Sequence, residues 1–276
     1  MKRPVSCFAV GAALMVAATS AMAVACTPAH KFSTVSPGSL TVATSTLPPF
    51  DSLDVSGNFS GIEADLIRYI AARECLRVQP AMVDPTGQTQ YVMAGRADLG
   101  AFGWYRSEAR STVLNLSAPL LVERLAIYSK DGSDSIESLK GRRVGTVQGY
   151  LWVPDLRAVL GDSVKLYPTP VALAQDLAAG RIDAAIDSYT KGAYAQTHSN
   201  GYPNLKIKPA KPDNRVRASV SPAQTAFLMP KSNDALAKAI DEDIAEARAS
   251  GEFSRILKHY GVESSSADAG APRFVK

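Results

Sequence analysis

The stretch that decides the fold is AGRADLGAFG, residues 94–103, because a near-copy of it, AGRIDAAIDS, occupies residues 179–188. In both copies Ala-Gly is typical of a helix end, where glycine adopts the left-handed conformation that closes the last turn. Arg-x-Asp then predicts a turn, and the apolar run after it predicts a short buried strand. Such a turn is common in unrelated proteins, so the phrase gains weight from its equivalent position in two similar halves.

The segments around each copy alternate between strand and helix patterns. In the first half, residues 39–45 alternate as a strand and residues 61–76 carry apolar side chains at helical spacing. In the second half, residues 142–149 predict a strand and VPDLRAVLG a helix. This alternation predicts an α/β fold with a mostly parallel sheet in each half, and ligands of such sheets bind outside the carboxyl ends of the strands. We therefore expect two lobes that face each other across a ligand.

The composition excludes several classes of function. The chain has 276 residues, with 30 Lys and Arg against 26 Asp and Glu, which gives a net charge of +4. These charges are spread along the sequence, without the basic run that tracks phosphates. We expect no nucleic-acid partner.

The first 23 residues have the pattern of a secretory signal peptide. Lys2 and Arg3 precede an apolar run over residues 8–18, and the segment ends in Ala21-Met22-Ala23, the small-x-small pattern of a cleavage site. The run is too short to span a bilayer, which takes about 20 residues. Its removal leaves 28 basic against 26 acidic residues, a charge of +2. We expect an exported, nearly neutral protein in the periplasm.

Two cysteines remain after the predicted cleavage, Cys26 and Cys75. An even pair in an oxidising compartment favours one disulfide. The alternative is that Ala23-Val24-Ala25-Cys26 acts as a degenerate lipoprotein box and that Cys26 is acylated. The two interpretations exclude each other, and we expect the disulfide.

Five motifs, in order along residues 39–262, resemble a known family. They are LPPF after the first strand, GIEADL (61–66), SEARSTVLNLSAPL (107–120), SIESLKGRRVGTVQG (135–149) and SGEFSRILKHYG (250–261). Together they resemble the periplasmic solute-binding proteins of ATP-driven (ABC) uptake systems, in the family 3 subclass that binds polar amino acids.

The resemblance implies a two-lobe, type II periplasmic-binding-protein fold with two hinge crossings, which closes around a solute and delivers it to an ABC permease. We expect a monomer that has no cofactor or metal and is not an enzyme. The expected divisions are a lead segment (24–38), lobe 1 (39–126 plus 225–263), lobe 2 (130–221) and a disordered tail (264–276), with crossings near 126–130 and 224–229.

Arg110 lies where the family places the arginine that binds the α-carboxylate of the solute. A guanidinium suits this role because it donates two parallel hydrogen bonds to a carboxylate. The alternative is a surface arginine paired with Glu108, and Arg106 is a second candidate. Ser107, in the same segment, is a further expected contact.

Asp187 ends the second copied strand, where the family carries an acid for the ammonium group of the solute. The spacing from Asp183 is one residue shorter than usual, so Ser188 is the alternative, and both residues also suit a helix N-cap. The resemblance also points to Gly149, whose backbone precedes a helix. Tyr150 follows where the family has Thr or Ser.

Ser45 lies where several relatives have Asp, which favours a neutral or acidic solute over a strongly cationic one. Four aromatic residues follow the two strand ends and are candidates to line the pocket: Trp104, Tyr105, Tyr150 and Trp152. We expect Trp104 and Tyr150 first, and Tyr105 is a weaker candidate. Aromatic side chains at strand ends more often belong to the core.

The sequence has no HExxH, GxSxG, Cys-x-x-Cys or phosphate-loop motif. Glu63, Asp65, Glu108 and Asp187 are the carboxylates with which acid–base chemistry could be built. Two alternatives to a transport receptor therefore stay open. One is a periplasmic enzyme similar to cyclohexadienyl dehydratase, and the other is a binding protein that reports to a membrane sensor.

Overall fold

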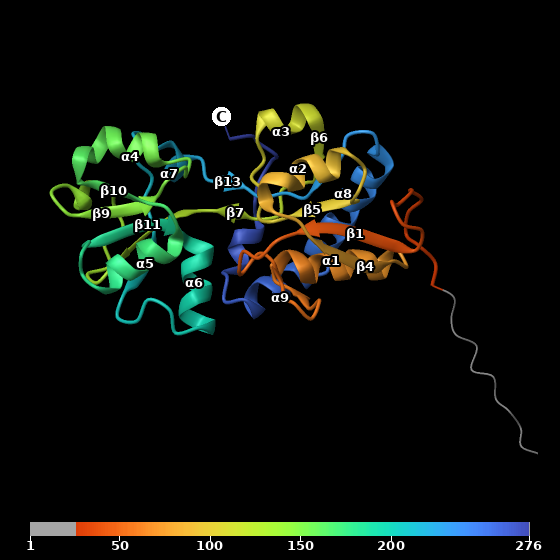
Figure 1. Cartoon of the computed structure of the whole chain (residues 1–276), viewed down its shortest axis with the longest axis horizontal. Helices are drawn as coiled ribbons and strands as arrows, with labels where there is room; N and C mark the ends of the chain where they lie inside the picture. Colours follow the sequence, from red (N-terminus) through yellow and green to blue (C-terminus); the bar gives the residue numbers. More distant parts are fainter. Residues whose placement is uncertain (1–25, 276) are drawn as a thin grey trace, which may run out of the picture.

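The computed structural model describes residues 26–275, which form two lobes side by side (Figure 1). The predicted signal peptide, residues 1–23, lies outside the described residues. Each lobe contains a five-stranded sheet with helices packed around it. Among the described residues, no helix has the length and apolar character needed to cross a membrane.

The sheet of lobe 1 has the strand order β4-β1-β5-β14-β6. Strand β1 is buried along its whole length because parallel neighbours flank it and helices cover both faces. Only β14 runs against the other strands, so the sheet is mostly parallel, as predicted. The elements of this lobe are β1 (Ser39–Thr44), β2 (Ser52–Leu53), β3 (Phe59–Ser60), α1 (Ile62–Arg73), β4 (Arg77–Met82), α2 (Pro85–Met93), β5 (Leu99–Ala101), α3 (Glu108–Val113), β6 (Leu114–Leu116), β14 (Leu228–Pro230), α8 (Asp234–Ala249), α9 (Glu252–His259) and the short 3-10 turn η3 (Ser264–Ala267).

The sheet of lobe 2 repeats this arrangement, with the strand order β10-β9-β11-β8-β12. Again a single strand, β8, runs against the other four. The reversed strand of each sheet is the one that follows a crossing between the lobes. The elements of lobe 2 are β8 (Leu125–Ser129), η1 (Glu137–Leu139), β9 (Val144–Val147), α4 (Val153–Leu160), η2 (Gly161–Ser163), β10 (Val164–Tyr167), α5 (Pro170–Ala178), β11 (Ala184–Ser188), α6 (Tyr189–His198), β12 (Lys206–Pro209) and α7 (Arg217–Val220).

Two short strands, β7 (Val122–Glu123) and β13 (Ala223–Gln224), connect the lobes and pair with each other in antiparallel fashion. The first crossing therefore lies before β8, whereas the sequence placed it at 126–130. That stretch was misassigned because β8 is a continuous apolar run, and such a run does not show which sheet a strand joins.

The two copied turns have the predicted local structure. Gly95 and Gly180 adopt positive φ angles of 66° and 68° just beyond α2 and α5. The backbone N–H of Asp98 donates to Thr41 O, and that of Asp183 donates to Arg143 O. Asp98 thus fastens its turn to β1, and Asp183 fastens its turn to the residue just before β9.

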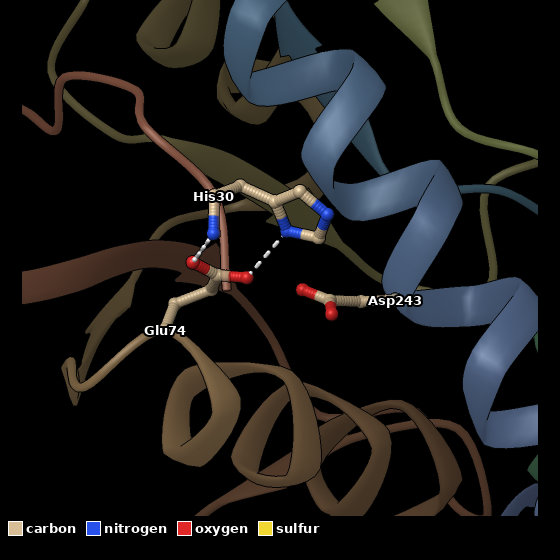
Figure 2. Close-up of side chains that lie close together, drawn as sticks. All are labelled: His30, Glu74 and Asp243. Carbon is tan, nitrogen blue, oxygen red and sulfur yellow. Dashed lines mark hydrogen bonds and ion pairs between the residues drawn. The ribbon is translucent and has the colours of Figure 1, made fainter. Parts of the chain in front are cut away.

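An N-terminal clasp attaches the first described residues to lobe 1. The predicted disulfide joins Cys26 to Cys75. Four residues later, the Nδ1 of His30 lies 2.6 Å from Glu74 Oε1, and the His30 backbone N–H donates to Glu74 Oε2 (Figure 2). Asp243 of α8 lies beside this pair and accepts a hydrogen bond from Arg73 Nε. The clasp therefore ties the leading segment to α1 and α8.

The C-terminal segment is ordered along the lobes, which corrects the expected disordered tail at 264–276. The Gln224 side chain, on crossing strand β13, donates to the backbone oxygens of Ala269 and Ala271 and accepts from Arg273 N. Val275 then pairs with Ser107 at the start of α3. Composition predicted disorder because the segment consists mainly of polar and small residues, whereas these contacts are made mainly by its backbone.

Candidate functional site

A cavity of about 590 Å³ lies between the lobes, beyond the ends of β5 and β11. This is the place predicted from the copied strands. Lobe 1, the crossing strand β7, lobe 2 and the C-terminal segment all contribute to its wall. The lining residues are Leu47, Phe50, Phe102, Gly103, Trp104, Tyr105, Ser107, Ala109, Arg110, Glu123, Gly149, Tyr150, Leu151, Trp152, Asp187, Ser188, Lys191 and Val275.

Arg110 reaches the cavity from α3. The Ser107 hydroxyl caps this short helix by accepting a hydrogen bond from Arg110 N. The guanidinium of Arg110 donates to Tyr105 O at 2.7 Å and lies 4.6 Å from the centre of the Trp104 ring. Burial lowers the pKa of this guanidinium. Glu108, the alternative partner considered for it, lies on the exposed side of α3, and Arg110 is free to offer donors to a ligand.

Aromatic side chains form much of the lobe 1 wall. Trp104 is oriented by a hydrogen bond from its Nε1 to Gln88 Oε1, and its ring lies 5.7 Å from that of Phe102. Gly103 has a positive φ of 60°, and a Cβ there would lie 3.1 Å from the Phe50 ring. Glycine therefore lets the loop after β5 turn closely over Phe50.

The lobe 2 wall begins at the turn after β9. Gly149 adopts a φ of 83° in this turn, and α4 starts only at Val153. The Gly149 backbone therefore lies ahead of the helix rather than in its first turn. Tyr150 faces the cavity, whereas Trp152 is 4 % exposed and donates from Nε1 to Thr146 Oγ1, which makes it mainly a core residue.

Asp187 forms an ion pair within the protein. Its Oδ1 lies 2.7 Å from the Nζ of Lys191, one turn along α6, and also accepts Ser188 N. The same ammonium donates to the Tyr150 hydroxyl at 2.7 Å. Burial by itself lowers the pKa of Lys191, but the Asp187 charge and the Tyr150 hydroxyl outweigh it and raise that pKa. The ammonium is therefore firmly charged inside the cleft.

Ser188 is fully used by the fold. Its hydroxyl accepts Lys191 N as the N-cap of α6 and donates to Glu123 Oε1 at 2.7 Å. Glu123, on crossing strand β7, is 3 % exposed. Burial raises the pKa of Glu123 to about 7, against the lowering effects of Ser188, Lys191 and Thr190. The cleft thus contains a carboxyl group that titrates near neutral pH.

Seven of the eight predicted ligand residues line this cavity, and Ser45 does not. Arg106, the second candidate arginine, also lies outside it and donates to backbone oxygens of Leu116 and Ser117. Sequence reasoning missed Glu123 and Lys191. The spacing of Lys191 four residues after Asp187 was a usable signal, because residues four apart face each other on a helix. No pattern in the residues around Glu123 indicated that it belongs to the site.

The other carboxylates considered for acid–base chemistry have structural partners or are exposed. Glu63 Oε2 accepts Gly103 N and so supports the loop below the cavity. Asp65 Oδ2 accepts the Tyr260 hydroxyl.

Metal-type ligands come together only in the N-terminal clasp, among the residues that the structure describes. His30, Glu74 and Asp243 offer ligand atoms within 4.8 Å of one another. These two carboxylates already have partners within the protein, since Arg73 Nε lies 2.7 Å from Asp243 and His30 Nδ1 lies 2.6 Å from Glu74. The other ring nitrogen of His30 lies 2.7 Å from Glu242. We treat the cluster as an ionic support for the clasp.

Comparisons with known proteins agree with this geometry. The profile of the family "Bacterial extracellular solute-binding proteins, family 3" matches residues 40–263. The chain is 24 % identical over 238 residues to the histidine-binding periplasmic protein of Escherichia coli K12, covering 78 % of this chain and 84 % of that protein. It is 25 % identical over 213 residues to the probable amino-acid-binding protein YxeM of Bacillus subtilis 168, covering 74 % and 77 %.

Among solved structures, substrate-binding domain 2 of Lactococcus lactis GlnP, in its open conformation, has a similar fold. Its TM-score is 0.68 at 24 % identity, over 81 % of this chain and 95 % of that domain. The family and the named relatives are binding proteins, so they favour a solute-binding protein over the dehydratase-like enzyme.

Proposed function

The chain belongs to family 3 of the bacterial extracellular solute-binding proteins, and on this premise we propose that it captures an amino acid or a related small carboxylate between its lobes for ABC-transporter uptake. The histidine-binding and amino-acid-binding relatives support this solute class. The signal-like residues 1–23 and the periplasmic relatives support a periplasmic location. We further propose that it acts as a monomer and hands its solute to an inner-membrane permease.

The observation that carries the proposal is the position of Arg110 in a cavity shared by both lobes. A charge-assisted hydrogen bond contributes about 1.5–3 kcal/mol, and a guanidinium donates two of them to one carboxylate. Residues of both lobes line the cavity, so a solute held there favours the conformation in which the lobes approach. Closure would form contacts that the open state lacks.

The test is thermal unfolding of the mature protein with a panel of amino acids and small carboxylates. A ligand present at about one hundred times its Kd stabilises the folded state by about 2.7 kcal/mol, which shifts Tm visibly. We expect at least one compound to give this shift and Arg110→Ala to abolish it. Arg157→Ala, on the exposed side of α4, is the matched control and should keep the shift. A shift that survives in Arg110→Ala would contradict the proposed pocket.

A further inference from the structure

Two cations face the cleft from opposite lobes. Arg110 lies in lobe 1 and Lys191 in lobe 2. The carboxyl groups on the cavity wall are those of Asp187 and Glu123. Lys191 is paired with Asp187, and Arg110 has only the Tyr105 carbonyl and the Trp104 ring as partners among the described residues. Of the two cations, Arg110 is therefore the one without an ion-pair partner among the described residues.

The carboxylate expected to hold a solute ammonium already has a cation of the protein beside it. Asp187 Oδ1 accepts both Lys191 Nζ and Ser188 N, and Ser188 is committed to Glu123 and to the α6 cap. A solute ammonium brought to Asp187 would lie close to the Lys191 ammonium, and two like charges in a partly desolvated site repel strongly. An amine-bearing solute therefore meets a competitor inside the protein.

Lys191 also has a donor left for a ligand. An ammonium has three N–H donors. Within the described part of the chain, one is directed to Asp187 and one to Tyr150. The third suits an oxygen acceptor, such as a carbonyl or a second carboxylate. Tyr150 and Asp187 hold the ammonium in place, so it is preorganised for that acceptor.

We infer that the solute is a small organic acid without an ammonium group, such as a 2-oxo acid or a dicarboxylate, with its carboxylate on Arg110 and a second oxygen acceptor on Lys191. This inference rests on the proposed function and narrows its solute class. The aromatic side chains between the two cations provide apolar contact for the carbon skeleton.

The experiment compares pairs of ligands in which the same carbon skeleton carries either an oxo group or an ammonium group beside the carboxylate. The matched pairs are pyruvate and alanine, 2-oxoglutarate and glutamate, and phenylpyruvate and phenylalanine, measured by calorimetry on the mature protein. In the pair that binds, we expect the oxo acid to bind at least ten times more tightly than the amino acid. Equal or tighter binding of the amino acid would overturn the inference and leave the proposed function intact. Absence of binding by every acid in the panel would contradict the proposed function itself.

Variants at Lys191 give a second measurement. Lys191→Met frees Asp187 for a solute ammonium, so we expect the preference within the binding pair to reverse by at least tenfold. Lys191→Arg keeps the cation and should keep the preference for the oxo acid. Because Lys191→Met leaves a buried charge unpaired, Asp187→Asn/Lys191→Met serves as a folded alternative, in which the preference for the oxo acid should disappear. If these variants retain the preference of the wild type, Lys191 does not set the solute class.

Discussion

The copied turns of lobe 1 and lobe 2 have the same shape, but the aspartate that holds each turn is buried in lobe 1 and partly exposed in lobe 2. In lobe 1, Asp98 is 1 % exposed, and its carboxylate accepts the backbone N–H groups of Val35 and Thr41 at 2.8 Å. In lobe 2, the Asp183 carboxylate also accepts a backbone N–H, that of Arg143 at 2.9 Å, but its side chain is 37 % exposed and forms an ion pair with the Arg143 guanidinium on the surface. The same sequence phrase therefore brings a strand end to the cleft in each lobe, but the burial of its aspartate differs between the lobes.

The contrast extends to the rest of each lobe. Lobe 1 carries the disulfide and the N-terminal clasp. The charged groups of lobe 2 meet largely at its surface, as where Arg215 pairs with Asp213 and Glu137. Exposed ion pairs contribute little, about 0–1 kcal/mol each. We therefore expect lobe 1 to be the more stable platform and lobe 2 the part that opens locally first.

Removal of the disulfide should have the largest effect on this contrast. We expect Cys26→Ser/Cys75→Ser to lower the free energy of unfolding by about 2–4 kcal/mol, because the bond closes a loop of 49 residues in the unfolded chain. Hydrogen exchange should show the loss at α1 and β1 and leave β9 and β11 unchanged. Equal loss of protection in both lobes would mean that they unfold as one unit.

The two aspartates provide a matched pair of variants. Asp98→Ala leaves the buried backbone N–H of Thr41 and the part-buried one of Val35 without their acceptor, so we expect it to destabilise the protein by about 2–3 kcal/mol. Asp183→Ala removes a surface ion pair and one solvent-exposed hydrogen bond from the Arg143 backbone N–H, and water can replace both, so it should cost about 1 kcal/mol. Urea unfolding of both variants measures the difference. Equal costs would show that burial does not distinguish the two turns.

Glu123 lies on β7, one of the two strands that join the lobes. It faces Lys191 of α6, Ser188, Thr190 and the tyrosines Tyr105 and Tyr128. Lys191 and both tyrosines have raised pKa values, so Glu123, with a pKa of about 7, is the group that changes charge between pH 6 and 8. Above this pKa its negative charge repels an anionic solute.

We therefore expect the Kd of a carboxylate solute to rise from pH 6 to pH 8, by at most about tenfold for each pH unit above 7. Glu123→Gln should remove this dependence and keep the affinity seen at low pH. Calorimetry in matched buffers checks both. An unchanged slope in the glutamine variant would assign the titration to another group.

The sequence predicted the features that depend on residues close together in the chain. The copied turns and the mostly parallel sheets followed from local patterns. The disulfide followed from the even number of cysteines left after cleavage, and the region of Arg110 and Asp187 from the family resemblance. The predicted position of the first crossing was wrong, because a buried strand such as β8 has the same apolar pattern whichever lobe's sheet it joins. Ser45 was assigned to the pocket by position alone, and the structure leaves it outside the cavity lining.

The remaining features depend on contacts between distant segments. Glu123 meets Ser188 across 65 residues, and Gln224 binds the C-terminal segment across 45 residues or more. Such pairs leave no periodic signal. Lys191 differs, because its spacing from Asp187 was visible. The sequence offered Asp187 either to the solute ammonium or to a helix N-cap, and its ion pair with Lys191 was not predicted.

The path of the C-terminal segment has a practical consequence for protein engineering. Val275 lines the cleft, and Gln224 on a crossing strand holds the residues just before it. A bulky group introduced next to Val275 would lie beside the cavity, whereas the first described residues are clasped to α1 and α8 in lobe 1. A purification handle therefore belongs at the mature amino end. A fluorophore attached near Val275 would test whether the lobes close on a solute, as proposed above.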